Sequence, residues 1–463
     1  MISTPLSVTR LPGYLLVGIL SAAALVQTYA GLELLGLRWD GGPFLRDMLS
    51  AHTFVFYEQA RETTQFILEL PVVVSMRLGL SDLYWLSAIW SLTLQLAPCI
   101  LTCACYFVLP PSHKIFFVLP TFHYFAGAAN VATAGLIEGP TAAAYFWVVF
   151  YALLFLREYW IARIAFLLLA IPILFLHEVM AILGPILVYA AWWRGRQATN
   201  LSWRLFFRAF AIFFLLVTIV QIGFVIAPKS VANRNGFVAQ MLGFQWLFTT
   251  ARLINVPAAL GLLAGLTALA LWRFPRCAWW LVSGFGIAAV ILVETALAYG
   301  LADQFYARDI PALIIPPLSI AALGALRTPE TANRLWSADH GRTLVVLAVL
   351  ACGTLLIQVA SAREWATYVT TYRDALRNRT GLIAWEELMN ELPRDQARLL
   401  ERTNFPFANP DMSLLLARDR HVQSIVMNPH TTIWGGWRPT APSEWPKGWF
   451  YERILPTVER GTP

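Results

Sequence analysis

Two aspartates lie just beyond the first long apolar segment, where an accessible carboxylate would meet a substrate at the edge of a membrane. Asp40 stands in the stretch LRWDGGPFLRD, three residues past the apolar segment 11–37, and two glycines follow it. Backbone at adjacent glycines bends readily around a ligand. Asp47, seven residues further on, is a second candidate catalytic residue. The alternative is a solvated aspartate before a Gly-Gly turn for Asp40, and a water-facing carboxylate on a surface helix for Asp47.

A second ionisable pair, His177-Glu178, stands between the short apolar segments 160–175 and 179–193. Ionisable side chains at the end of an apolar hairpin are costly unless they face water or a polar cavity. The pair is therefore a candidate for binding or orienting a substrate. The alternative is a plain interfacial turn, in which Glu178 stabilises the N-terminus of the following helix. One histidine and one glutamate adjacent in sequence do not make a tetrahedral metal site.

Basic side chains in two further segments are candidates for holding an anionic group. Arg308, close to Tyr306 in ADQFYARDIP, would lie at the outer interface, and its guanidinium fork matches a phosphate group. Lys229 lies in the long segment 228–256 together with two arginines. The alternative for each is an interfacial role, in which the side chain extends from the membrane toward water.

The composition divides the chain into two parts. Of its 463 residues, 58% are hydrophobic and 13% are charged, whereas a soluble domain is about 25% charged. Residues 361–463 hold 25 of the 61 charged residues, so this part resembles a soluble domain and 1–360 a polytopic membrane protein. Most of the net charge of +7 lies in 1–360, where basic loops set membrane orientation, so it does not indicate a nucleic-acid partner.

The apolar segments predict an all-α membrane domain of about eleven transmembrane helices. These segments are 11–37, 82–109, 115–135, 140–156, 160–175, 179–193, 205–227, 257–273, 278–300, 311–327 and 343–360. Two of the intervening loops, 38–81 and 228–256, are too long to be plain connectors. Both mix short apolar stretches with charged residues, which predicts helices lying along the membrane surface.

The distribution of basic residues predicts the orientation. Arginines gather in the short loops on one side, while the opposite loops hold most of the carboxylates, including Asp40, Glu138 and Glu178. By the positive-inside rule, the N-terminus is cytoplasmic. Residues 361–463 are then extracytoplasmic, and we expect them to form a small α/β or α+β domain.

These features together resemble the GT-C superfamily of integral-membrane glycosyltransferases. The shared features are a cytoplasmic N-terminus, a carboxylate just past the outer end of the first helix and a loop of surface helices before the second. The stretch YEQARETTQFILELPVVVSMRLGLSDLYWLSAIW is similar to the usual passage from that loop into the second helix. The stretch YARDIPALIIPPLSIAAL is similar to the late helix in which prolines follow an arginine. The resemblance covers 1–360 as topology and only these stretches as sequence.

The resemblance implies an enzyme that moves a sugar from a polyprenyl-phosphate or polyprenyl-pyrophosphate carrier to a glycan, lipid or protein acceptor. Transfer proceeds with inversion outside the cytoplasm, from the lipid bilayer of a bacterial inner membrane. The first-loop acid, here Asp40, acts as general base on the acceptor hydroxyl. The phosphate leaving group needs cationic stabilisation, expected from Arg308 first and then from Arg61 and Lys229. Some members begin this loop with paired acids, but here Gly41 follows Asp40, so a divalent-metal requirement stays open.

Two other classes of protein remain compatible with the sequence. A different envelope-polysaccharide protein, such as a polymerase, ligase or acyltransferase, would depend on His177 or on arginines of 228–256 instead of Asp40. A transporter or a non-enzymatic scaffold is the third class. Transporters often contain two related halves, and the sequence shows no such repeat.

Overall fold

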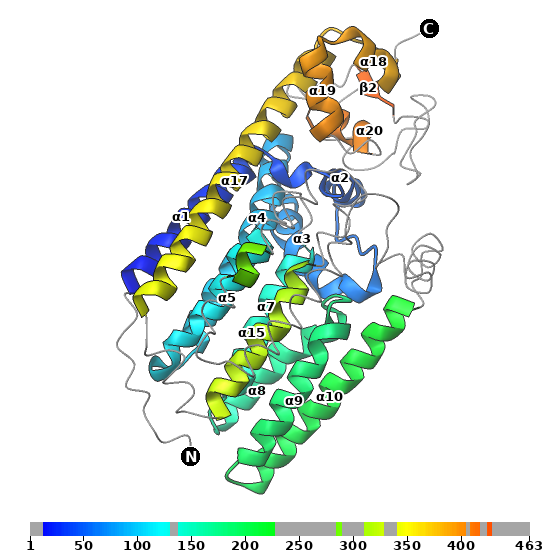
Figure 1. The fold of residues 1–463 in the computed structure, drawn as a ribbon. Coiled ribbons are helices and arrows are strands. Elements are labelled where there is room, and N and C mark those ends of the chain that lie inside the picture. Colours follow the sequence, from blue (N-terminus) through cyan, green and yellow to red (C-terminus); the bar gives the residue numbers. More distant parts are fainter. Residues whose placement is uncertain are drawn as a thin grey trace.

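A bundle of long helices carries a group of short elements at one of its ends (Figure 1). The computed structural model describes residues 13–129, 138–226, 284–288, 310–327, 340–403, 408–416 and 424–427. The longer described helices are α1 (Gly13–Leu32), α2 (Gly41–Ala51), α3 (Glu62–Arg77), α4 (Leu83–Val108), α7 (Glu138–Leu154), α8 (Trp160–Ala170), α9 (Met180–Gln197), α10 (Leu201–Ile226), α15 (Ile310–Arg327) and α17 (His340–Leu376). The shorter turns among them are η1 (Leu35–Leu37), η2 (Gln59–Arg61), η3 (Pro111–Phe117), α5 (Val118–His123), η4 (Tyr124–Ala128) and η5 (Ile171–Phe175).

Three helices in the described part of the chain are long and apolar enough to cross a membrane, namely Leu83–Val108, Leu201–Ile226 and Leu347–Leu376. The first two have 26 residues each and extend about 39 Å, more than the roughly 30 Å hydrocarbon core of a bilayer. Shorter apolar helices accompany them at Leu16–Leu32, Trp160–Phe175 and Ile314–Arg327. The helical fold is thus confirmed. The count of eleven spans stays a prediction, since 257–273 and most of 278–300 lie outside the described residues.

One face of α10 is apolar and exposed. Leu205, Ile212, Leu216 and Ile219 are all exposed, although the helix is among the most apolar in the chain. The opposite face, with Phe207 and other aromatic rings, packs into the bundle. A contiguous exposed apolar surface of this kind is disfavoured in water and suits contact with lipid.

Successive helices alternate in direction, so loops that are far apart in sequence meet at one end of the bundle. Arg61, between α2 and α3, forms ion pairs with Glu138 at the start of α7 and with Glu178 just before α9. At the other end, Arg194 near the end of α9 donates to the carbonyl of Leu156, which follows α7. The acidic loop residues described here therefore gather at the end that also carries α2, α3 and the chain beyond α17 (Figure 1).

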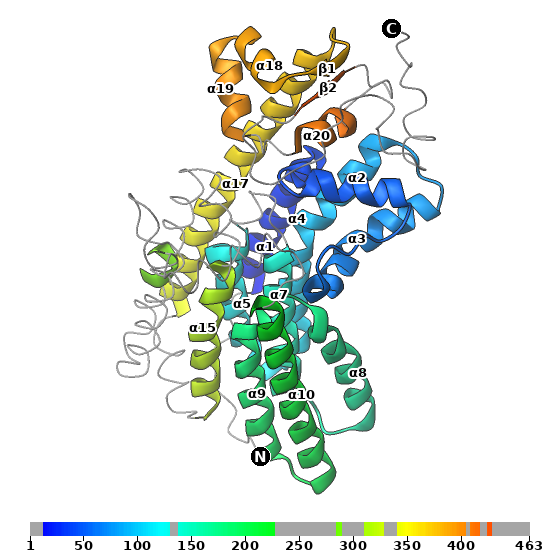
Figure 2. The same ribbon diagram turned by 90° about the vertical axis from the view of Figure 1, so that its right-hand side faces the viewer.

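Helix α2 runs across the bundle rather than along it. Figure 1 shows it end-on, and Figure 2 shows it from the side, crossing the direction of α1, α4 and α17. Its residues Leu45, Met48 and Leu49 are fully buried, while its other face is partly open. This orientation is the one expected of a helix that lies along a membrane surface.

The C-terminal elements pack directly on this end of the bundle. Helix α17 continues without a break through residue 361, the expected domain boundary. Beyond it come β1 (Gly381–Ile383), α18 (Trp385–Glu391), α19 (Arg394–Thr403), α20 (Asn409–Leu415) and β2 (Ser424–Val426), the two strands pairing in parallel. Their side chains share one core with the first loop: Leu45, Met48, Trp90, Trp365, Tyr368, Met412 and Ile425 belong to it. Residues 428–463 lie outside the described part, so a separate α/β or α+β domain stays a prediction.

Candidate functional site

Three polar side chains of one short stretch share a face. Arg61, Gln65 and Glu69 are four residues apart along η2 and α3, a spacing that places side chains one above another on a helix. Gln65 and Glu69 are buried and Arg61 is largely so. Polar groups buried on one helix face need partners, and those of Arg61 and Gln65 come from the start of α7 and the turn before α9.

Arg61 makes most of the polar contacts of this cluster. Its Nε donates to Glu178 Oε2 at 2.8 Å and to Oε1 at 3.0 Å, and its Nη1 donates to Glu138 Oε2 at 2.8 Å. Gln65 Nε2 donates to the other oxygen of Glu138, Oε1, at 2.9 Å. The Arg61, Glu138 and Glu178 side chains are 15%, 16% and 22% exposed, so water reaches the network from one side.

Charge pairing fixes the ionisation of this network. Burial raises the pKa of Glu178, but the facing guanidinium of Arg61 outweighs it and lowers that pKa to about 2. Burial lowers the pKa of Arg61, but Glu178 and Glu138 more than compensate and hold it well above its ordinary value. Arg61 and Glu178 are therefore both charged at neutral pH.

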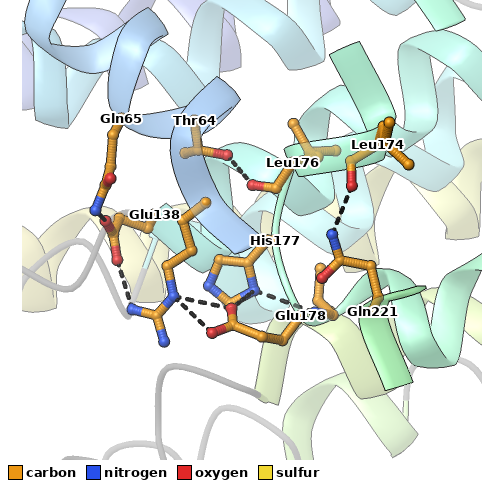
Figure 3. Close-up of polar contacts among 10 residues, drawn as sticks. Thr64, Gln65, Glu138, Leu174, Leu176, His177, Glu178 and Gln221 are labelled. Carbon is orange, nitrogen blue, oxygen red and sulfur yellow. Dashed lines mark hydrogen bonds and ion pairs between the residues drawn. The ribbon is translucent and has the colours of Figure 1, made fainter. Parts of the chain in front are cut away.

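The turn that carries His177 and Glu178 is held by backbone contacts. The Thr64 hydroxyl of α3 donates to the carbonyl of Leu176 (Figure 3). His177 is 4% exposed, and its Nδ1 lies 3.1 Å from the backbone N of Val179 and 3.4 Å from Glu178 Oε2. His177 thus contacts both the start of α9 and the carboxylate that pairs with Arg61.

Glu69 is a buried carboxyl group at the inner end of the same face. Its side chain is fully buried, and Oε2 accepts the backbone N–H of Val55 at 2.8 Å. Burial raises the pKa of Glu69 to about 8, and the nearby charge of Glu138 contributes to this rise. Its Oε1 has no hydrogen-bond partner among the residues that the structure describes. Glu69 is therefore mostly protonated at neutral pH.

Asp40 occupies the N-cap position of α2 and is half-buried. The preceding residue, Trp39, is buried and has a φ of 61°, a left-handed conformation that costs a bulky residue about 1–3 kcal/mol and is often found at functional sites. The backbone carbonyl of Asp40 accepts the N–H of Phe44 at 3.0 Å, as in the first turn of a helix. The conformation of the backbone around Asp40 is thus imposed by the fold.

The glycines after Asp40 serve a purpose different from the predicted one. A Cβ at Gly41 would collide with the carbonyl oxygen of Gly36, and the Gly41 carbonyl accepts the indole N–H of Trp90 at 2.9 Å. A Cβ at Gly42 would lie 3.3 Å from Met412 Sδ. The expectation of backbone that is free to bend around a ligand is therefore wrong, because close packing is what requires the glycines.

Asp47 lies about two turns further along α2, in a second cluster. Arg46 Nε donates to Asp47 Oδ1 at 2.7 Å, and the Tyr57 hydroxyl donates to Oδ2. Arg46 also forms an ion pair with Asp411 of α20, with Nη1 2.9 Å from Oδ1. Both oxygens of Asp47 are therefore engaged in contacts that hold the first loop together.

The structure brings three of the candidate residues, Arg61, His177 and Glu178, close together, a proximity that the sequence did not predict. Gln65, Glu138 and Glu69 lie with them and were not candidates. The four-residue spacing of Arg61, Gln65 and Glu69 in the sequence could have indicated that these side chains share one helix face. The predicted phosphate-binding residues Arg308, Tyr306 and Lys229 lie outside the described residues. Within the described ranges, no group of three or more His, Cys, Asp or Glu side chains is arranged to hold a metal ion.

Comparison with known proteins adds no relative. No family model matches the chain, and neither the curated proteins nor the solved structures compared with it include a match.

Proposed function

We propose that the protein is a glycosyltransferase that moves a sugar from a polyprenyl-phosphate or polyprenyl-pyrophosphate carrier to a hydroxyl group of an acceptor, with Asp40 as general base. The observation that carries the proposal is the setting of Asp40. It occupies the N-cap position of a helix that crosses the bundle, shortly after α1 and η1, on backbone that η1 and α4 fix in place. Fixed backbone limits where the carboxylate can lie, which favours proton transfer at a membrane boundary.

The reaction follows from the chemistry of the donor. The carboxylate of Asp40 takes the proton of the acceptor hydroxyl, and the oxygen attacks the anomeric carbon of the sugar. The bond between that carbon and the phosphate oxygen breaks, and its electron pair leaves with the phosphate. Attack from the face opposite the leaving group inverts the anomeric centre. Between the two aspartates, the proposal takes Asp40 as the base because the resemblance places the base just past the first helix; Asp47 is engaged by Arg46 and Tyr57.

The charge balance of the Arg61 network argues against a role in binding the phosphate of the donor. Two carboxylates, Glu138 and Glu178, surround one guanidinium, so an approaching phosphate would meet more negative than positive charge. In the proposal this network orients the acceptor through its partly exposed oxygens. Stabilisation of the leaving group is assigned to Arg308 with Tyr306 and to Lys229, on the strength of the sequence resemblance.

The proposed site faces away from the cytoplasm. The end of the bundle that carries Asp40 also gathers the acidic loop residues, while the short loops of the other end are rich in arginine. Basic loops remain in the cytoplasm. A lipid carrier in the outer leaflet of a bacterial inner membrane would then present its sugar to this end, and the acceptor would be a glycan, lipid or protein of the cell envelope.

The test is the variant Asp40→Asn, which removes the basic oxygen while keeping the shape of the side chain. The full-length protein is placed in liposomes that contain undecaprenyl phosphate linked to radiolabelled glucose, mannose, galactose or arabinose, each in turn, with a bacterial lipid extract as the source of hydroxyl acceptors. Loss of the labelled donor is measured. We expect the wild-type protein to consume at least one donor and Asp40→Asn to be slower by about 100-fold or more.

The matched control is Asp82→Asn. Asp82 caps α4 at the same end of the bundle by accepting the Trp85 N–H at 3.1 Å. Asparagine caps a helix about as well as aspartate, so this variant should keep its rate within about twofold. Wild-type transfer by Asp40→Asn would remove Asp40 as the base, and failure to consume any of the labelled donors would contradict the glycosyltransferase proposal.

A further inference from the structure

Helix α2 is held from two sides at the end of the bundle. From the membrane side, the indole N–H of Trp90 in α4 donates to the carbonyl of Gly41, the first residue of α2. From the other side, Asp411 of α20 forms an ion pair with Arg46 in the middle of α2, at 2.9 Å. The side chains of Arg46 and Asp411 are 14% and 3% exposed, so this ion pair is almost completely removed from water.

Apolar contacts accompany the ion pair. Met412 and Leu415 of α20 approach α2 at Gly42, two residues after Asp40, where a Cβ would lie 3.3 Å from Met412 Sδ and 3.8 Å from Leu415 Cδ1. Leu45 of α2 belongs to the same buried core. Helix α20 thus touches α2 both at its first turn and at Arg46, and the close approach at Gly42 leaves little room for α2 to shift independently.

Helix α20 is in turn fixed to the membrane helix α17. The Tyr372 hydroxyl donates to the carbonyl of Asn409 at 3.1 Å and lies 3.0 Å from Ser413 Oγ. Arg373 Nε donates to the carbonyl of Leu416 at 2.9 Å. Tyr372 is fully buried. A continuous set of contacts therefore leads from α17 through α20 to the helix that begins at Asp40.

A buried ion pair is costly to form because both partners lose their hydration. Burial raises the pKa of Asp411 to about 7, against the opposing effect of Arg46. Replacing such a pair by apolar side chains would often be neutral or stabilising, and its best-attested use is to fix one alignment of the elements that it joins. The elements joined here are α2 and α20.

We propose that the C-terminal part of the chain positions the base of the proposed reaction: Asp411, through Arg46, fixes the placement of α2 and with it the Asp40 carboxylate. Asp411 and Arg46 are then positioning residues that do not touch the substrate. The inference rests on the proposed function, because it assigns to Asp40 the role argued above.

The test compares Asp411→Asn with Glu391→Gln in the full-length protein. Glu391 pairs with Arg379 in the same C-terminal part at 2.6 Å, but the two side chains are 52% and 25% exposed, and neither belongs to the contacts of α2. Two quantities are measured: hydrogen exchange of the α2 amides 41–51, and the rate of consumption of the labelled donor as kcat and KM.

We expect Asp411→Asn to lower kcat by about 10-fold to 100-fold, because a small displacement of a catalytic group has an effect of this size. The KM should change little, and exchange of the α2 amides should rise by about tenfold as α2 loosens locally. Glu391→Gln should change none of these. The double variant Arg46→Gln/Asp411→Asn leaves no unpaired charge from this pair and replaces the single variant if that variant fails to fold. It should show the same fall in kcat.

The exchange measurement separates failure of this inference from failure of the proposed function. Unchanged exchange in α2 for both the single and the double variant overturns the inference, whatever the activity. Loosened exchange with full kcat also overturns it, because α2 would then move without affecting the base. If the wild-type protein consumes no labelled donor, the proposed function fails, and exchange alone decides whether Asp411 fixes α2.

Discussion

Glu69 is a single buried carboxyl group that makes the free energy of unfolding depend on pH. The carboxyl group is fully buried and accepts one backbone N–H, from Val55. One such hydrogen bond offsets only part of the free energy lost when a charged carboxylate leaves water. Burial therefore raises the pKa of Glu69 from 4.5 to about 8.

We predict that Glu69→Gln stabilises the protein increasingly as the pH rises. The folded state holds the Glu69 proton more tightly than the unfolded state, so the wild-type free energy of unfolding falls as the pH rises from about 4.5 to about 8. Glutamine can accept the same N–H and carries no titrating proton. At pH 7.5 the variant should exceed the wild type by about 4 kcal/mol, a difference that vanishes near pH 4.

Denaturant unfolding of the protein in detergent micelles at pH 4, 6 and 7.5 measures this difference. Glu62→Gln at the half-buried start of α3 is the comparison, since it makes the same chemical change on the same helix without touching the Glu69–Val55 contact. A difference between Glu69→Gln and wild type that stays constant over this range would contradict the proposed protonation of Glu69.

At the scale of elements, the first loop depends on close approach between short helices. The turn η1 and the start of α2 come so close that Gly41 has no room for a side chain, and the Trp90 indole fills the space on the other side. The left-handed Trp39 turns the chain just before Asp40. The helix that carries both aspartates is therefore placed by packing as well as by hydrogen bonds.

We predict that Gly41→Ala displaces the start of α2. The added Cβ would collide with the backbone carbonyl of Gly36, which cannot move aside as a flexible side chain can. Overpacking of this kind costs about 2 kcal/mol, and donor consumption should fall with it. Gly18→Ala in α1 is the matched control, because nothing lies within 4 Å of its Cβ position. Alanine there should be neutral or stabilising by up to about 1 kcal/mol. Equal thermal stability and activity of the two variants would contradict this account of the first loop.

At the scale of the whole molecule, the buried side chains of the described residues form two cores. One fills the helical bundle, with Phe125, Phe150 and Phe214 among its rings. The other joins the first loop to the C-terminal elements and includes Trp90 and Tyr368. Helix α17 contributes to both, since Leu347 belongs to the first core and Trp365 to the second. The C-terminal elements and the membrane bundle are thus packed as one unit where α2 lies.

We predict that the end of the helical bundle that carries Asp40 and the end that carries the turn between α9 and α10 lie on opposite sides of the membrane. Alkaline phosphatase, which is active only outside the cytoplasm, should be inactive when fused after Gln197, the last residue of α9, which follows Arg194 and Arg196. The same enzyme fused after Pro463 should be active. The reverse pattern in bacterial cells would invert the orientation and remove Asp40 from the extracytoplasmic side.

The sequence by itself determined which segments are helical and apolar. The predicted segments 82–109 and 205–227 agree with α4 and α10 to within a few residues, and 311–327 agrees with α15. A run of apolar residues long enough to span a bilayer is a local property, and the membrane imposes the same requirement on every such segment. The turn at His177-Glu178 between two helices was recognisable for the same reason.

Only the tertiary structure decided the partners of the polar side chains. Arg61 pairs with Glu138 and Glu178, which belong to two other loops, and Arg46 pairs with Asp411 near the far end of the chain. No periodicity links such residues, because an ion pair forms wherever the fold brings two loops together. The prediction of flexible backbone at the glycines after Asp40 was wrong because the neighbours that require glycine there come from outside α2. The local pattern of apolar residues decides where the helices form. Long-range packing decides which polar side chains become partners.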